Sequence, residues 1–343
     1  MKLFNEVFGN INSPHFLAPM AAVTHLPFRL LCRSLGADVV VTELISVQSL
    51  YYNLIREKDS IKLNHLLKTN IDEKPVGLQV FGHSKDYFSK LLEKLNINLL
   101  GYDFLDFNVG CPVNKVCLPG AGSRLLTEEK LPILESIIKE VCEKRPDIPF
   151  SIKIRSGYKN QMNIKKFSEM VNQFELLMVT IHPRTAFQSY KESANHAITT
   201  QLVDLCNHPV IANGDINSLS DAEHILTHTN SKGVMIGRTA RKYPWVFDSR
   251  FQNKIFVQDY LNILRSYLIN CERFSYSGIY FVREILSGMI RGFHNSSSYR
   301  KNIGLKENFS DLIELIDSLE IFFEKCEISE IQGFKSNFNQ NNH

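Results

Sequence analysis

The sequence predicts a (β/α)8 barrel of the TIM-barrel type followed by an all-helical domain. Three observations lead to this prediction: eight short apolar runs, helical periodicity between most of them, and a change of rhythm near residue 251. Runs that are apolar on both faces are typical of parallel strands covered on both sides, and eight of them favour a closed barrel. A doubly wound open sheet is the alternative, but no GxGxxG motif follows any run, which weakens its dinucleotide-binding form.

The elements of the barrel are expected in the following order. The eight strands are HFLAPM (15–20), DVVVTE (38–43), PVGLQVF (75–81), DFLDFN (103–108), PFSIKI (149–154), LMVTIH (177–182), HPVIAN (208–213) and KGVMIG (232–237). The helices are LPFRLLCRSLG (26–36), KDYFSKLLEKL (85–95), LPILESIIKEVCEK (131–144), NIKKFSEMVNQF (163–174) and SLSDAEHIL (218–226). Gly36 suits the C-terminus of the first helix, and Ser218 suits the N-cap of the last.

The chain after residue 250 reads as helical. Three helical stretches follow one another there: QDYLNILRSYLINCERF (258–274), IYFVREILSGMIRGF (279–293) and DLIELIDSLEIFFEKCE (311–327). We therefore assign the barrel to residues 1–250 and the helical domain to 251–343, with an acidic last part and a frayed polar end, SNFNQNNH. The first part of this domain is basic, with Arg265, Arg273, Arg283, Arg291, Arg300 and Lys301.

The composition indicates a soluble globular protein. Of 343 residues, 44% are hydrophobic and 22% are charged, and the net charge of +3 does not by itself indicate nucleic acid, although a basic patch can exist within it. Seven cysteines without CxxC or zinc-type spacing are read as reduced thiols, so we expect a cytoplasmic protein without a metal site. The first residues lack the apolar core of a signal peptide, and no run is long enough to span a membrane. We expect a monomer.

Polar or special residues stand at the end of almost every expected strand. Active sites of such barrels form at the C-terminal ends of the strands, so this concentration favours a ligand site over a plain structural rim. The residues at or just beyond these ends are Pro19, Met20, Glu43, Gln79, Asn108, Cys111, Lys153, Arg155, His182, Arg184, Asn213, Gly214, Asp215, Gly237 and Arg238.

The ends of the seventh and eighth strands predict a phosphate site. Asn213-Gly214-Asp215 and Gly237-Arg238 stand where such barrels bind phosphate, although either pair is also compatible with an ordinary turn. Lys153 and His182 could then flank a flavin or another planar ring, or else be satisfied structural groups.

A thiol in an unusual setting follows the fourth strand. Cys111 lies between Gly110 and Pro112, with a small-residue stretch, Gly120-Ala121-Gly122-Ser123, behind it that we expect to be mobile. A reactive role is one interpretation, and an inert buried cysteine is the other.

Here the chain resembles the tRNA-dihydrouridine synthases, a family of flavin enzymes that reduce uridine in tRNA. The resemblance runs from about residue 15 to 305. The matching stretches are LAPMAAVTHLPFRLLCRSLGA (17–37), VTELIS (41–46), LQVFG (78–82), DFNVGCPVNKV (106–116), GAGSRLL (120–126), IKIRSGY (152–158), IHPRTAFQSY (181–190), IANGDI (211–216), VMIGRTARKYPWVF (234–247) and RGFHNSSSYRKNI (291–303).

The resemblance implies a role for each strand-end residue. FMN would lie at the rim and NADPH would reduce it. The FMN phosphate would meet Asn213, Gly214, Asp215, Gly237 and Arg238, and its ring would lie near Pro19, Met20, Ala21, Gln79, Lys153 and His182. Uracil would be held by Asn108, Arg155 and Arg184, and tRNA phosphates by Arg291, Arg300 and Lys301.

The resemblance also implies the chemistry. Hydride would reach C6 of the uracil from the flavin, and Cys111 would give the proton to C5 from the opposite side. The uridine would have to leave its place in the folded RNA.

The sequence departs from the pattern of the family at several positions. They are His25, Arg124, Ala186, Phe187, Asn195, His196, Thr239, Lys242 and Tyr243. Since Cys111, Lys153 and His182 are kept, we expect the chemistry to be retained and the RNA contacts to differ.

Two other readings stay open. One is an FMN-dependent oxidoreductase of a free pyrimidine, of the dihydroorotate dehydrogenase kind. The other is a non-catalytic RNA-binding relative. The basic helical domain counts against the first, and the intact Cys111 against the second.

Overall fold

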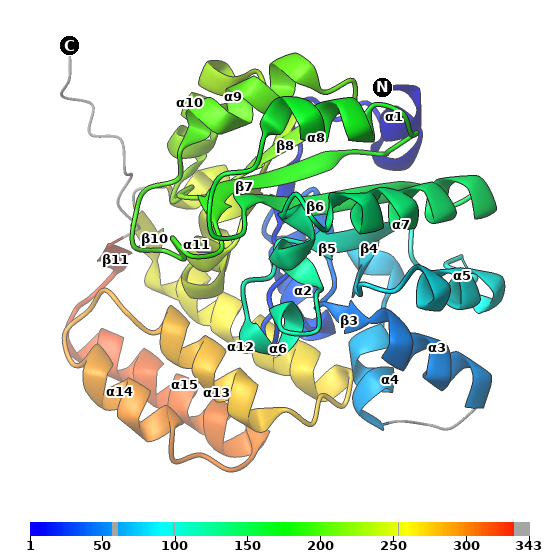
Figure 1. Ribbon diagram of the computed structural model, residues 1–343. Coiled ribbons are helices and arrows are strands. Elements are labelled where there is room, and N and C mark those ends of the chain that lie inside the picture. Colours follow the sequence, from blue (N-terminus) through cyan, green and yellow to red (C-terminus); the bar gives the residue numbers. More distant parts are fainter. Residues whose placement is uncertain (57–60, 99, 253, 333–343) are drawn as a thin grey trace.

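Eight parallel strands close into a barrel in the computed structural model, which describes residues 1–56, 61–98, 100–252 and 254–332. The barrel closes because β1 pairs with β9 on one side and β2 on the other, and β2 pairs directly with β4. The prediction of a (β/α)8 barrel is therefore confirmed (Figure 1). The eight strands are β1 (His15–Leu17), β2 (Val39–Val41), β4 (Val76–Phe81), β5 (Phe104–Val109), β6 (Phe150–Gly157), β7 (Val179–Thr185), β8 (Val210–Asn213) and β9 (Gly233–Ile236). A short extra strand, β3 (Ile45–Ser46), pairs with the end of β4.

The five helices expected within the barrel are all present. They are α2 (Leu26–Ser34), α5 (Lys85–Lys94), α7 (Leu131–Lys144), α8 (Ile164–Val171) and α10 (Leu219–Thr229). Ser218 caps α10 as expected, since its hydroxyl accepts from the Asp221 amide at 3.0 Å. Beyond α2, a Cβ on Gly36 would stand 2.8 Å from the Phe247 carbonyl oxygen, so this close approach requires glycine.

Several helices were not predicted. They are α1 (Lys2–Phe8), α3 (Val47–Arg56), α4 (Ile61–Leu67), α6 (Asn114–Cys117), α9 (His196–Leu205), α11 (Arg238–Lys242) and α14 (Ser296–Ile303), with the 3-10 turns η1 (Ile71–Glu73), η2 (Gly122–Leu126), η3 (Pro244–Phe247) and η4 (Ser249–Phe251).

The N-terminal end of the barrel is sealed by α1. The Phe8 ring meets the edges of Phe16 and Phe104, with both centroid distances 5.5 Å, and Phe4 packs against Phe8. This aromatic plug fills one end of the barrel, so a ligand site has to form at the other end.

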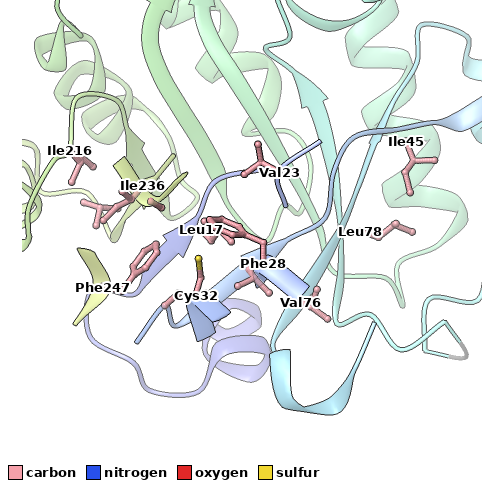
Figure 2. Close-up of a cluster of buried hydrophobic side chains, with 14 of the residues drawn as sticks. Leu17, Val23, Phe28, Cys32, Ile45, Val76, Leu78, Ile216, Ile236 and Phe247 are labelled. Atoms are coloured by element: carbon pink, nitrogen blue, oxygen red, sulfur yellow. The ribbon is translucent and has the colours of Figure 1, made fainter. Parts of the chain in front are cut away.

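A large hydrophobic core surrounds the strands. Figure 2 shows one part of it, where Leu17 and Ile236 of the barrel lie beside Phe28 and Cys32 of α2 and Phe247 of η3. All of these side chains are buried, which fixes α2 and the chain after β9 against the sheet.

The C-terminal helices pack directly onto the barrel. They are α12 (Val257–Arg273), α13 (Ile279–Met289), α14 (Ser296–Ile303) and α15 (Phe309–Lys325), which lie together on one side of the barrel (Figure 1). The Tyr267 hydroxyl of α12 lies 3.1 Å from Nε2 of His25 before α2, and the Tyr276 ring stacks on His25 at 4.0 Å. The helices and the barrel share one continuous core. A two-stranded antiparallel sheet pairs the segment before α12 with the segment after α15, β10 (Lys254–Phe256) with β11 (Glu330–Gln332).

Two negative findings concern the described part of the chain. None of its helices has the length and apolar character needed to cross a bilayer. All seven cysteines are free thiols. The predicted frayed end, SNFNQNNH, lies outside the described residues.

Candidate functional site

A cavity of about 450 Å³ opens at the C-terminal ends of the barrel strands. Its size and mixed polar and apolar lining are typical of a small-molecule site. Most of the strand-end residues singled out in the sequence line it: Pro19, Met20, Ala21, Asn108, Cys111, Lys153, Arg155, His182, Asn213, Gly214, Asp215, Gly237 and Arg238.

Gln79 lies beneath the cavity and is fully buried. Its amide nitrogen donates to Asp106 Oδ2 at 2.6 Å, and its oxygen accepts from Asn108 Nδ2 at 2.9 Å. The other carboxylate oxygen of Asp106 accepts from Ser151 at 2.7 Å, and burial raises the pKa of Asp106. This network orients Asn108 from below.

The turn after β5 is tightly held around Cys111. Asn108 Oδ1 accepts from the amides of Gly110 at 3.1 Å and Cys111 at 2.9 Å. The Cys111 carbonyl in turn accepts from the amide and the hydroxyl of Ser123, at 3.1 and 3.0 Å. The stretch expected to be a mobile loop is therefore packed against the backbone of the thiol. Gly122 is required there, because its φ is +57° and a Cβ would approach the Cys111 oxygen to 2.7 Å.

The Cys111 thiol is half-buried and faces the cavity. Burial raises the pKa of Cys111 above its ordinary value, while nearby Arg155 and Lys153 oppose this shift through their charge. The thiol is therefore protonated at neutral pH. The charges of Arg155 and Lys153 would stabilise the thiolate that remains after it gives up its proton.

The Lys153 side chain on β6 extends past the neighbouring strand β7 to β8. Its Nζ donates to Asn213 Oδ1 at 3.0 Å, and Asn213 Nδ2 donates to the Met235 carbonyl at 2.7 Å. Burial, assisted by the charge of Arg155, lowers the pKa of Lys153 to about 8. Most of the population is still an ammonium at neutral pH, so Lys153 is a charged donor in the floor of the cavity.

Arg184 lies behind His182, and it is not among the residues that line the cavity. Its Nη1 lies 3.1 Å from His182 Nε2, and its Nη2 donates to the two Asp215 oxygens at 2.8 and 2.6 Å. A guanidinium can only donate, so Nε2 is the acceptor. Burial, with the charges of the surrounding cations, lowers the pKa of His182. The imidazole is thus neutral and carries its proton on Nδ1.

Asp215 joins two arginines. Besides Arg184, it accepts from Arg238 Nη2 at 2.7 Å and from the Ala194 amide at 2.7 Å. The desolvation that would raise the pKa of Asp215 is outweighed by these donors and charges, which lower it. The carboxylate is therefore ionised, and it positions the two guanidinium groups.

Tyr190 also lines the cavity, and it was not among the site residues predicted from the sequence. The Arg238 guanidinium lies over its ring at 4.2 Å, with Arg155 at 5.7 Å and Arg184 at 5.9 Å. Three guanidinium groups thus lie around the Tyr190 ring, and their positive charge favours an anionic ligand at this end of the cavity.

A second cavity, of about 550 Å³, adjoins the first through Arg238 and Arg241. We call it the arginine groove; its cationic lining residues are Arg238, Arg241, Lys242, Arg283, Arg291 and Arg300. One acid, Glu284, also lines it and lies 3.5 Å from Arg241.

The predicted basic residues of the helical domain lie in different places, and Arg283 is one of those that line the arginine groove. Arg291 and Arg300 line the arginine groove, whereas Lys301 is exposed outside its lining. Arg265 is paired with Asp317 and Glu320 of α15.

Within the described ranges no group of three or more His, Cys, Asp or Glu side chains is placed to hold a metal ion.

Comparisons with known proteins identify relatives along most of the chain. The sequence profile of a family described as dihydrouridine synthase matches residues 16–324. A tRNA-dihydrouridine synthase B of Pseudomonas syringae pv. tomato is 35% identical over 237 residues, which cover 67% of this chain and 66%, just under two thirds, of that protein. A protein of Aquifex aeolicus named probable tRNA-dihydrouridine synthase is 31% identical over 311 residues, covering 88% of this chain and 94% of that one.

Solved structures resemble the chain in fold. The old yellow enzyme from Trypanosoma cruzi superposes with a TM-score of 0.51 at 9% identity, covering 70% of this chain and 90% of that one. Histamine dehydrogenase from Rhizobium sp. 4-9 gives a TM-score of 0.52 at 10% identity, covering 71% and 47%. At these identities the likeness concerns the fold alone.

Proposed function

The chain belongs to the dihydrouridine synthase family, and we propose that it reduces the C5=C6 bond of uridines in tRNA to 5,6-dihydrouridine, with FMN as cofactor and NADPH as reductant. The observation that carries this proposal is a protonated thiol, Cys111, facing the same cavity as the buried donors Lys153 and His182. The adjoining arginine groove supports a polyanionic substrate.

The residues of the cavity fit a flavin mononucleotide. Ala18, Met20 and Ile236 offer apolar surface for a planar ring, and Lys153 and His182 offer polar donors. A Cβ on Gly237 would lie 3.3 Å from Ala18 Cβ and 3.7 Å from the Met20 sulfur, so glycine leaves this part of the cavity open. Bound here, FMN supplies the hydride for C6 of the uracil.

We assign the phosphate of the cofactor to the ends of β8 and β9. Asn213, Gly214, Gly237 and Arg238 would hold it, with Pro19, Met20 and Ala21 beside the ring. The Asp215 carboxylate is already held by Arg184 and Arg238, so its role is to position these cations. Gln79 acts from beneath, through Asn108.

Cys111 provides the proton for C5. When hydride adds to C6, negative charge develops toward O4 and C5 becomes basic. The neutral Cys111 thiol donates its proton there, and Lys153 and Arg155 stabilise the thiolate that remains. Asn108 and Arg155 are the side chains that we assign to the uracil.

The arginine groove would bind the tRNA backbone. Apart from Arg238, which we assign to the cofactor phosphate, the groove has five cations, and these suit the backbone phosphates next to an extruded uridine. A free pyrimidine needs no such groove, which argues against the alternative of a small-molecule reductase.

Flavin spectroscopy tests this proposal. The purified protein should bind FMN, lose the visible flavin absorbance on anaerobic addition of NADPH, and regain it when unmodified tRNA is added. Uridine monophosphate should restore it far more slowly. Equal reoxidation by both substrates would favour the free-pyrimidine reading, and a protein that binds tRNA but no flavin would favour the non-catalytic one.

A further inference from the structure

Two aromatic rings and two cations gather at the rim beside the active-site cavity. We call Arg124, Tyr158, Lys159 and Phe187 the rim cluster. Phe187 is 60% exposed and meets Tyr158 edge to face, with ring centroids 5.4 Å apart. Lys159 Nζ lies 5.5 Å from the centre of the Phe187 ring, and the Arg124 guanidinium lies 5.1 Å from that of Tyr158. An exposed phenylalanine with a lysine beside its ring is not explained by the core.

The backbone under these rings is fixed. Past the paired parts of β6 and β7, the Ala186 amide donates to the Gly157 carbonyl at 3.0 Å, and the Phe187 amide donates to the Tyr158 carbonyl at 3.2 Å. Gly157 has φ +151°, and a Cβ there would stand 2.1 Å from the Asn160 carbonyl oxygen. The two rings are therefore presented on a rigid support, which lowers the entropic cost of binding on them.

A surface cavity of about 740 Å³ lies against the cluster. Its polar lining combines three cations, three amides and two acids: Arg124, Lys159, Lys166, Asn160, Gln161, Asn163, Glu128 and Glu129. Glu129 lies 3.5 Å from Arg124, so one acid is already paired and the balance of the lining is positive.

The position of the cluster relative to the arginine groove is set by the barrel. The cluster lies on the segments that follow β5, β6 and β7, whereas the arginine groove begins after β9, and the order around the sheet is β5, β6, β7, β8, β9. The two surfaces therefore flank the mouth of the active-site cavity on different sides. Arg155, which lines that cavity, donates to the Thr185 carbonyl at 2.9 Å and so ties the cluster to the site.

We propose that the rim cluster binds an unpaired nucleotide of the tRNA substrate, whose base stacks on Phe187, while the arginine groove holds the backbone on the other side of the reacting uridine. This inference rests on the proposed function and adds to it a second contact that sets how the RNA is oriented.

The chemistry of the cluster matches a nucleotide. A base stacks on any exposed aromatic face regardless of its identity, and Arg124 and Lys159 can meet the phosphates next to it. The amides of Asn160 and Gln161 offer donors and acceptors for a base edge, whereas the Asn163 oxygen already accepts from the Lys166 amide at 3.0 Å. A double helix has no free base faces to offer, so an unpaired segment is the fitting partner.

The test compares variants of Phe187 in the flavin-loaded full-length protein with unmodified tRNA transcript. Stacking predicts that Phe187→Ala and Phe187→Leu raise the dissociation constant and KM for tRNA about tenfold, whereas Phe187→Tyr stays near wild type. Phe187→Ala should leave the slope of log affinity against log salt unchanged, since no charge is lost, and Lys159→Gln should reduce that slope by about one.

Phe256→Ala is the matched control. Phe256 is also an exposed phenylalanine with a lysine near its ring, Lys254 at 5.3 Å, but it lies at the end of β10 and is not part of the rim cluster. The Phe256→Ala variant should bind tRNA as tightly as the wild type does. Phe187→Ala with wild-type KM and affinity, in a preparation that reduces tRNA, overturns the rim-cluster proposal alone. Wild-type protein that neither binds nor reduces tRNA overturns the proposed function and this proposal with it.

Discussion

Arg184 Nη1 lies 3.1 Å from His182 Nε2, and the same guanidinium is held by both oxygens of Asp215. Since a guanidinium has no acceptor, this relationship makes Nε2 of His182 an acceptor and leaves the proton on Nδ1. The Asp215 carboxylate, at the end of the cavity assigned to the phosphate, is thus linked through Arg184 to the protonation state of His182 in the cavity wall.

We predict that His182 is the neutral Nδ1–H tautomer throughout the range pH 5 to 8, because burial and the surrounding cations lower its pKa. The ¹⁵N chemical shifts of the labelled protein should show this tautomer, and Arg184→Met should allow the other tautomer to appear. A wild-type His182 signal that titrates near pH 6.5 would show that the link does not hold.

The ion pair itself should matter for stability. The Arg184 side chain is 3% exposed, and Arg184→Met removes its two hydrogen bonds to Asp215, which keeps Arg238 and the Ala194 amide as donors; the free energy of unfolding should fall by about 2 kcal/mol. Urea denaturation measures this change. Lys139→Met, which removes an exposed pair with Glu143 on α7, is the control and should cost less than about 1 kcal/mol.

Removal of the thiol should stop the chemistry. Cys111→Ala leaves no acid opposite C5, so the rate of dihydrouridine formation should fall by at least about 100-fold, while FMN is still bound and reduced. Cys142→Ser is the matched control, because Cys142 is another half-buried thiol with a raised pKa but lies on α7, outside the cavity. Comparable losses in both variants would indicate a structural effect of thiol removal.

The arginine groove should control the salt dependence of tRNA binding. Arg291→Gln removes one cation from its lining, so tRNA affinity should fall and the slope of log affinity against log salt should decrease by about one. Filter binding between 50 and 200 mM salt measures both. If the slope is unchanged while the affinity falls, the arginine does not meet a phosphate.

Acid should weaken the contact between the barrel and its C-terminal helices. His25 is buried against Tyr267 and Tyr276, and burial lowers the pKa of His25 to about 3. Below pH 6.5 the unfolded chain therefore binds a proton that the folded chain excludes, and the folded state loses stability as the pH falls. From pH 7 to pH 5 this group alone accounts for about 2 kcal/mol. Between pH 7 and pH 5, the free energy of unfolding of the His25→Gln variant, measured by urea denaturation, should fall by about 2 kcal/mol less than that of the wild type. An equal fall in both proteins would contradict the low pKa of His25 in the folded state.

The strands were predictable from the sequence because each is buried on both faces, as in VVV of β2 and FLDFNV of β5. Helices such as α9 and α14 were missed for physical reasons. The first carries two adjacent threonines, Thr199 and Thr200, that lower its helix propensity. The second, SSSYRKNI, has no apolar period and depends on its packing with α13 and α15.

For the candidate site, the sequence predicted which residues come together but not which of them form hydrogen bonds with one another. Strand ends converge in a parallel barrel, so Cys111, Lys153 and His182 come together whatever their partners are. The fold decides which of these polar side chains form hydrogen bonds with one another between neighbouring strands. The hydrogen bond of Gln79 to Asp106, which lies within an apolar run, therefore had no signal in the sequence. Neither did the packing of Arg238 over Tyr190, which depends on the conformation of a loop.

The most direct test of the central claim is mass spectrometry of tRNA, mapped by position, from cells with and without the gene for this protein. The account predicts that at least one uridine loses its 5,6-dihydro form in the deletion strain, that the wild-type gene restores it, and that Cys111→Ala does not. Unchanged dihydrouridine at every position, with no related enzyme present to modify the same sites, would contradict tRNA reduction. Full restoration by Cys111→Ala would contradict the role of the thiol.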